Sequence, residues 1–262
     1  MRNGVRSVEP FGLGSESIRF VRAGYPVAPR SVPSILGREG EIGIWFRSGE
    51  GAFLDRADAG RRLADTLRAQ VGKDCVVYAL PRGGVIVGGV IARALGAPLD
   101  IVGVRKIGHP SSLEYAIGAV AEAGPPLLNS TETASLDSSW LESAVLRESA
   151  SARESRARFG ARATMLSAEG RIAIVVDDGV ATGYTLRAAL HAVRAQRPER
   201  LVAAVPVGPP ETVEVLRREA DEVVVLKIPE HGFGAVGSYY EDFSPVSDEQ
   251  VRAELHKRAH KG

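Results

Sequence analysis

The 262-residue sequence has only one cysteine, Cys75, and no apolar run near the ~20 residues that a membrane-spanning helix needs. A single cysteine excludes an intrachain disulfide and a zinc cluster built from cysteines. An excess of either charge is also missing, because 33 Lys and Arg residues are balanced by 32 Asp and Glu residues. No global basic field is available to attract nucleic acid. An anionic ligand therefore has to be held by a local site.

The first 44 residues differ from the rest of the chain. They are rich in Gly, Pro and Ser and show no persistent helical or strand period, which is typical of a flexible segment. We predict a leader over residues 1–44, with a partner-binding arm as the alternative, and a folded domain over residues 45–262. The N-terminus also lacks the apolar core of a signal peptide. We therefore expect a cytoplasmic protein with no membrane or nucleic-acid partner.

Short apolar runs alternate with helical patterns after Trp45. Strands are predicted at residues 75–80, 99–104, 171–176, 201–205 and 222–228. Helices are predicted at residues 55–71, 85–95, 139–159, 182–196 and 210–219, with a last helix that begins at Ser247. The predicted helix caps are Asp55, Ser139 with Glu142, and Ser247 with Gln250. Residues 105–137 are expected to be loop-like, with short strands at residues 116–121 and 127–128.

Each predicted strand is an uninterrupted apolar run, and helices separate most of the strands. This order indicates an α/β fold in which helices cover both faces of an open parallel sheet. We predict about five strands, together with a small lid formed by the chain ends.

The most informative pattern occupies residues 172–185. An apolar strand ends at Asp177 and Asp178, and Ala181-Thr182-Gly183-Tyr184-Thr185 then begins a helix. Ligands of open α/β folds bind at the carboxyl edge of the sheet. Adjacent carboxylates repel each other, whereas vicinal ribose hydroxyls or a hard cation would use both. Gly183 allows close backbone approach, so the helix N-terminus is suited to phosphate; the alternative is that Thr182 only caps the helix.

With strand, acid pair, loop and helix in this order, the segment resembles the 5-phosphoribosyl-1-pyrophosphate motif of the type I phosphoribosyltransferases. The resemblance covers residues 46–255. It implies that Asp177 and Asp178 bind the ribose 2′- and 3′-hydroxyls. It also implies that the 5′-phosphate is bound by the loop formed by Ala181, Thr182, Gly183, Tyr184 and Thr185.

Two further segments fit this family at the position of the pyrophosphate. The first follows the strand at residues 75–80 and consists of Pro81, Arg82, Gly83 and Gly84; its alternative role is a tight turn that packs a helix onto the sheet. The second is the basic pair Arg105 and Lys106, which follows the strand at residues 99–104. The family often presents a basic pair there to the pyrophosphate, and a solvated strand end is the alternative.

The C-terminal part resembles the closing segment of purine-salvage members of the family. By that likeness, Glu230 would contact the Mg²⁺–pyrophosphate, and the acceptor would be flanked by Phe233, Tyr239 and Tyr240. The alternative is that these aromatic residues close an edge of the core. The strand at residues 201–206 lacks the lysine with which purine-salvage enzymes read a 6-oxo group. A hypoxanthine or guanine acceptor is therefore not favoured.

The resemblance implies an enzyme that transfers the phosphoribosyl group to a nitrogenous acceptor such as a nucleobase and releases pyrophosphate. Its catalytic residues would be Asp177, Asp178 and Lys106, and Mg²⁺ would be held mainly by ligand oxygens. A homodimer is compatible with this prediction. Two alternatives stay open: a non-catalytic regulator that binds the same ligand, and a nucleotide hydrolase or phosphorylase on the same scaffold. The residues do not specify the acceptor.

Deletion of residues 2–40 is expected to leave folding and ligand binding intact, because this segment lacks periodic apolar residues. Thermal unfolding of the truncated and full chains, with and without phosphoribosyl pyrophosphate, measures both properties. A melting temperature lowered by more than about 4 °C would show that the segment packs on the domain.

Overall fold

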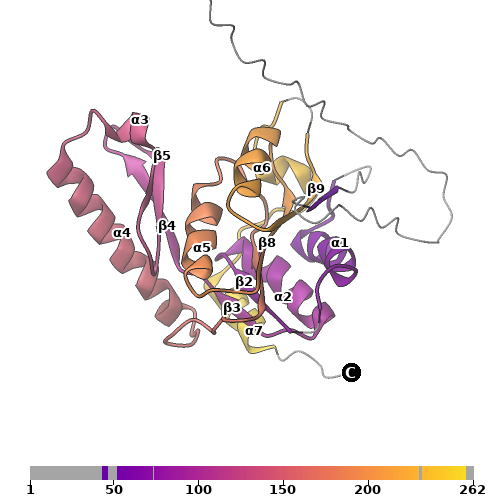
Figure 1. Ribbon diagram of the computed structural model, residues 1–262. Coiled ribbons are helices and arrows are strands. Elements are labelled where there is room, and N and C mark those ends of the chain that lie inside the picture. The colour runs from indigo at the N-terminus through magenta and orange to yellow at the C-terminus, as the bar shows by residue number, and fades with distance from the viewer. Residues whose placement is uncertain (1–42, 47–51, 73, 230–231, 258–262) are drawn as a thin grey trace, which may run out of the picture. The chain divides into compact units, whose positions relative to one another are not determined.

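The computed structural model describes residues 43–46, 52–72, 74–229 and 232–257. Its main sheet has six strands in the order β1-β9-β8-β7-β2-β3, and all neighbouring pairs are parallel (Figure 1). The strands are β1 (Gly43–Phe46), β2 (Cys75–Ala79), β3 (Leu99–Ile101), β7 (Ile172–Val176), β8 (Arg200–Val207) and β9 (Glu222–Lys227). The predicted α/β class with an open parallel sheet is confirmed. About five strands were expected, and β1 is the sixth, paired with β9 at the edge.

Helices cover both faces of this sheet, as predicted. Within β2, Val76 and Tyr78 belong to the core beneath α5 (Tyr184–Arg194) and α6 (Pro210–Arg217). Cys75 and Val77 belong to the opposite core, beneath α1 (Arg56–Arg68) and α2 (Gly83–Leu95). Because successive side chains of a strand point to opposite faces, a strand buried on both sides has to be apolar throughout.

Two of the predicted helix caps are confirmed. The Asp55 carboxylate accepts from the Asp58 N–H at the start of α1, and Ser247 with Gln250 forms a capping box on α7 (Asp248–His256). The cap predicted at Ser139 is wrong. Asp137 caps α4 (Ser138–Arg158), because its carboxylate accepts from the Trp140 N–H at 2.8 Å.

The prediction of a largely loop-like segment over residues 105–137 is wrong, whereas the two short strands predicted within it, at residues 116–121 and 127–128, are confirmed. A second sheet of three antiparallel strands lies there: β4 (Val104–His109), β5 (Ser112–Ala121) and β6 (Leu127–Leu128). The short helix α3 (Ser130–Thr133) follows it. One face of this sheet buries three apolar side chains against α4, those of Ile107, Ile117 and Val120. The sequence does not predict β4 or the first residues of β5, because Gly108 and polar residues interrupt the apolar residues there.

Helix α5 lies between the two sheets. It packs on β7 and β8 of the main sheet and on β4 and β5 of the small sheet. Figure 1 shows α4, the small sheet, α5 and the main sheet as successive layers. The small sheet contributes Val104, Ala119 and Ala121 to the core that α5 shares with the main sheet. The small sheet is therefore held on the main sheet through α5.

The predicted leader lies outside the described residues, apart from residues 43 and 44 at the start of β1, so it stays a prediction. The predicted lid also stays a prediction. Of the C-terminal segment, the structure shows the short helix η1 (Val236–Tyr239), a bridge between Phe53 and Tyr240, and α7 packed beside α2.

A buried ion-pair network ties α4 to the main sheet. The Arg156 side chain is 4% exposed and its NH2 group donates to both Asp100 oxygens, at 2.9 and 3.1 Å. It also lies 3.2 Å from Glu122 and donates to the carbonyl oxygen of Ile101. Burial raises the pKa of Glu122, although Arg156 acts in the opposite direction. The guanidinium therefore joins the end of α4, strand β3 and the end of β5.

Arg156→Met is expected to lower the free energy of unfolding by about 3–5 kcal/mol, because removal of one partner leaves buried carboxylates unpaired. Urea unfolding at unchanged m-value measures this. The matched control is Arg147→Met on the same helix, where the side chain is 60% exposed. The control should stay within about 0.5 kcal/mol of the parent. Similar losses in both variants would contradict a special role for the buried network.

Candidate functional site

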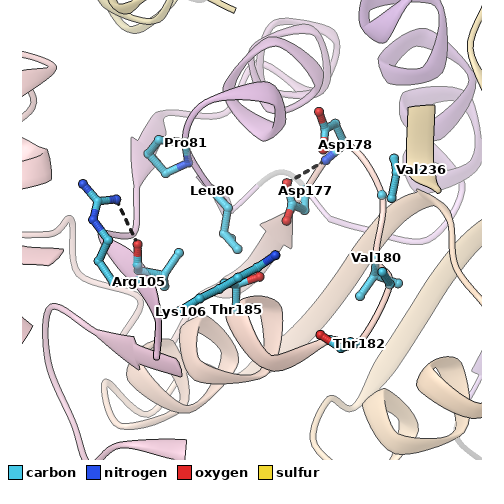
Figure 2. A pocket seen from close by; sticks show the side chains of 14 residues that line it. Leu80, Pro81, Arg105, Lys106, Asp177, Asp178, Val180, Thr182, Thr185 and Val236 are labelled. Atoms are coloured by element: carbon cyan, nitrogen blue, oxygen red, sulfur yellow. Dashed lines mark hydrogen bonds between the residues drawn. The ribbon is translucent and has the colours of Figure 1, made fainter. Parts of the chain in front are cut away.

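The carboxyl ends of β2 and β7 meet at one edge of the main sheet. The Leu80 N–H donates to the Val176 carbonyl oxygen at 2.9 Å, which joins the two chain segments where the strands end. A pocket of ≈ 390 Å³ opens at this edge (Figure 2). It is lined by Leu80, Pro81, Val104, Arg105, Lys106, Asp177, Asp178, Gly179, Val180, Ala181, Thr182, Gly183, Thr185 and Val236. The pocket thus combines residues that the sequence places in four separate segments.

Asp177 and Asp178 lie side by side at the end of β7, and both are partly buried. The Asp178 N–H donates to Asp177 Oδ1 at 2.8 Å, which orients the first carboxylate. The second carboxylate accepts at Oδ2 from Arg56 Nε at 2.7 Å. The Tyr240 hydroxyl donates to the Asp178 carbonyl oxygen at 2.5 Å. The acid pair is therefore held by one hydrogen bond of its own and by two distant residues, Arg56 and Tyr240.

The electrostatic state of Asp177 is perturbed. Burial raises the pKa of Asp177 well above its usual value, and the negative charge of Asp178 adds to this, whereas Lys106 acts in the opposite direction. Burial disfavours the charged form of a carboxyl group, and a like charge close by disfavours it further. A ligand that hydrogen-bonds to the carboxylate or brings positive charge would offset this cost.

The loop after the acid pair has the geometry predicted for an anion site. Gly183 has φ +79° and precedes the first residue of α5. Within the described part of the chain, the backbone N–H groups of residues 181–185 have no hydrogen-bond partner. Unpaired N–H groups at a helix N-terminus attract anions. The alternative in which Thr182 caps the helix does not hold, because Gly183 is the cap residue.

Close packing explains why residue 183 has no side chain. A Cβ atom there would lie 2.8 Å from the Thr212 methyl carbon, and the Thr212 hydroxyl donates to the Ala181 carbonyl oxygen at 2.5 Å. Thr182 and Thr185 line the pocket, whereas the partly buried Tyr184 packs against the core beneath α5. Of this loop, only Tyr184 is not part of the pocket lining.

Of the four residues predicted to bind pyrophosphate, 81–84, one lines the pocket and the others are engaged in packing or in an ion pair. Pro81 lines the pocket, and the peptide bond between Pro81 and Arg82 is cis. Gly84, the second residue of α2, lies so close to β7 that a Cβ would be 2.9 Å from the Val176 carbonyl oxygen. Arg82 is not part of the pocket lining, and its Nε lies 3.1 Å from Asp248. Gly84 therefore allows close packing of α2 on β7, and the Arg82 side chain forms an ion pair with Asp248 instead of lining the pocket.

Arg105 and Lys106 belong to β4 of the small sheet, and not to a strand end as the sequence suggested. Both line the pocket. In Figure 2 the Lys106 side chain extends across the pocket towards Thr185 and Asp177, whereas Arg105 turns away and donates to the Val104 carbonyl oxygen at 3.2 Å. Lys106 is exposed. It is therefore the cation that faces the acid pair across the pocket.

The aromatic residues predicted for the acceptor do not line the pocket. Phe233 stacks on Tyr239, with ring centroids 5.6 Å apart, and Tyr240 is buried between Phe53 and Phe243. Their position favours the alternative in which they close an edge of the core, and their contact with an acceptor stays a prediction. Glu230, the predicted metal ligand, lies outside the described residues.

Sequence reasoning missed several residues of this region, among them Arg56 and Val236. Arg56 follows a helix cap, where an arginine is usually solvated, and its partner Asp178 is 122 residues away. No local pattern indicates such a pair. Val236 lines the pocket beside Gly179, and a Cβ atom on Gly179 would lie 2.3 Å from it. Its position within Gly234-Ala235-Val236-Gly237 resembles a loop and carries no specific signal.

Residues 51–242 match the family described as the phosphoribosyl transferase domain. Two curated sequences of Mycobacterium tuberculosis, named "putative phosphoribosyl transferase", are each 42% identical over 211 residues, or 80% of this chain. The chain spans about half of their length, 47%. The crystal structure of TT1426 from Thermus thermophilus is similar with 43% identity and a TM-score of 0.67, covering 80% of this chain and 100% of that one. None of the helices in the described ranges is long and apolar enough to cross a membrane.

The two aspartates should respond in opposite directions to substitution in the ligand-free protein. Because the folded-state pKa of Asp177 is raised, its contribution to stability is lost as pH rises from the ordinary aspartate value of about 3.9 through the raised value. Asp177→Asn should therefore raise the melting temperature at pH 7, with a smaller gain at pH 4. Asp178→Asn should lower it, because Arg56 loses its ion pair.

Thermal unfolding at the two pH values measures both effects. The opposite signs serve as an internal control, since both substitutions are isosteric and adjacent. A lower melting temperature for Asp177→Asn at pH 7 would contradict this prediction, because it would show that the Asp177 carboxyl group stabilises the fold.

Proposed function

Because the chain belongs to the family of the phosphoribosyl transferase domain, we propose that it uses 5-phosphoribosyl-1-pyrophosphate and Mg²⁺ to transfer the phosphoribosyl group to a nitrogenous acceptor. The acceptor in this proposal is a nucleobase, and pyrophosphate is released. One observation carries the proposal. A carboxylate pair, a loop of unpaired N–H groups and a lysine from another sheet line the same pocket.

The arrangement of these groups suggests how the ligand lies. The loop at residues 181–185 suits the 5′-phosphate, because its N–H groups have no other partner. Asp177 and Asp178 are adjacent acceptors suited to the two ribose hydroxyls. Lys106 and Pro81 then remain for the pyrophosphate, on the part of the pocket wall away from Val236 (Figure 2). The acceptor would approach C1 from the opposite side, where Val236 lies.

The reaction requires no nucleophile from the protein. The C1–O bond to pyrophosphate breaks and its electron pair leaves with pyrophosphate, while a nitrogen lone pair of the acceptor forms the C1–N bond. The proton of that nitrogen passes to solvent. The chain contributes positioning, which is worth up to about 7–11 kcal/mol in well-oriented reactions. Lys106 adds positive charge where negative charge develops.

The residues of the pocket fit Mg²⁺. This ion usually takes one or two carboxylates and fills its other positions with water and substrate phosphate oxygens, and the pocket offers the two carboxylates Asp177 and Asp178. We propose that ligand oxygens hold the ion mainly, with Glu230 as a further protein ligand. Bound Mg²⁺ would neutralise charge on the pyrophosphate. Within the described ranges, no group of three or more His, Cys, Asp or Glu side chains could hold a metal ion.

Lys106→Ala is expected to reduce turnover far more than ligand affinity. If Lys106 stabilises charge that develops as pyrophosphate leaves, its loss acts on the transition state more than on the ground state. Pyrophosphate release is measured with Mg²⁺ and a pool of bases and amines, and affinity by calorimetry. The control is Arg153→Ala, an exposed arginine on α4 that does not line the pocket. Equal losses of turnover and affinity would make Lys106 a ground-state anchor.

The same assay separates the proposed enzyme from its alternatives. Tight binding without pyrophosphate release for any acceptor would indicate a regulator that only binds the ligand. Release that requires only water or inorganic phosphate would indicate a hydrolase or a phosphorylase. Base-dependent release by the parent protein supports the transferase.

A further inference from the structure

The orientation of the Asp178 carboxylate is set by a residue far from it in the sequence. Arg56, the first residue of α1, donates from Nε to Asp178 Oδ2 at 2.7 Å, a distance typical of a charge-assisted hydrogen bond. The two side chains are only 11% and 16% exposed, so solvent screens the pair weakly. The pair thus has the geometry of a structural clamp on one carboxylate of the pocket.

Arg56 is itself held by the C-terminal segment. Its guanidinium carbon lies 3.8 Å from the centre of the Phe243 ring, and NH1 donates to the Ser244 carbonyl oxygen at 2.9 Å. A planar guanidinium can stack on a ring and donate in two directions at once, which a lysine ammonium cannot do in the same geometry. The three contacts leave the Arg56 head group little freedom to move.

The start of α2 closes the remaining side of the pair. A Cβ atom on Gly83 would lie 1.7 Å from Asp178 Oδ2 and 2.7 Å from Arg56 Nε. The ion pair therefore occupies the space that a side chain at residue 83 would need. Asp178 is confined between Gly83 and Arg56, and Oδ2 is already used by Arg56.

We infer that Arg56 is a positioning residue: it orients Asp178 so that Oδ1 accepts a hydrogen bond from one ribose hydroxyl of the ligand. This inference rests on the proposed function, because it assigns a ribose to the pocket. It extends that function by giving a role to Arg56 and, through stacking, to Phe243. Neither residue is part of the pocket lining.

The test compares ribose 5-phosphate with its 2-deoxy and 3-deoxy analogues, by calorimetry on the full chain. The parent protein should prefer ribose 5-phosphate over each analogue by about 10-fold or more, the scale of one charge-assisted hydrogen bond. In Arg56→Met, the preference over one analogue should fall to roughly 2-fold, while affinity for that analogue is retained. Arg56→Lys should restore only part of the preference.

A double-mutant cycle separates positioning from plain structural support. Asp178→Asn should abolish the same preference, and Arg56→Met added to it should cause no further loss. The matched control is Arg61→Met on the same helix, where the side chain is 58% exposed. If Arg56→Met does not fold, Phe243→Leu provides the test, because it removes only the ring under the guanidinium. A partial loss of the preference is then expected.

The outcomes distinguish this inference from the function on which it rests. If the parent protein does not bind ribose 5-phosphate, or binds all three sugars equally, the proposed function fails together with the inference. If the parent prefers ribose and the Arg56 or Phe243 variant keeps the full preference, the positioning role is overturned and the proposed function stands. Additive losses in the double mutant would also overturn it.

Discussion

The repulsion between Asp177 and Asp178 at the end of β7 is the constraint on which the site depends. Burial and the neighbouring charge raise the pKa of Asp177, so the acid pair is costly in the ligand-free protein. The surrounding chain offsets that cost on two sides. Arg56 pairs with Asp178 from α1, and Lys106 faces the pair across the pocket from β4 (Figure 2). Strain of this kind is common at functional sites, where affinity is gained at the expense of stability.

Glycines make this arrangement sterically possible. Gly83 leaves room for the ion pair, and Gly84 lets the start of α2 approach β7. Gly183 supplies the left-handed conformation from which α5 begins. At each of these positions a Cβ atom would collide with the acid pair, with the backbone beside it or with Thr212. The loops of the pocket are therefore shaped by contacts with one another as much as by their own turn preferences.

Helix α5 connects the two halves of the site. Its N-terminus carries the loop suited to phosphate, and its sides pack on both sheets. Lys106 reaches the pocket from the small sheet, whereas the acid pair comes from the main sheet. The position of the lysine relative to the aspartates thus depends on the packing of α5 against Val104, Ala119 and Ala121. The buried Arg156 network, which joins α4 to β3 and β5, supports the same arrangement from the outer side.

Local sequence patterns were enough to predict most strands and helices of the main sheet. Apolar runs such as Ile172 to Val176 are typical of strands buried on both faces, and the order of strand, acid pair and loop resembles that of the family. Other features arise only when distant segments of the chain pack together. Strand β4 and the first residues of β5 were not predicted, because polar residues and Gly108 interrupt the apolar residues there. Likewise, the ion pairs Arg56–Asp178 and Arg82–Asp248 join segments that are distant in the sequence. Such contacts follow from how whole layers pack, and no short-range pattern encodes them.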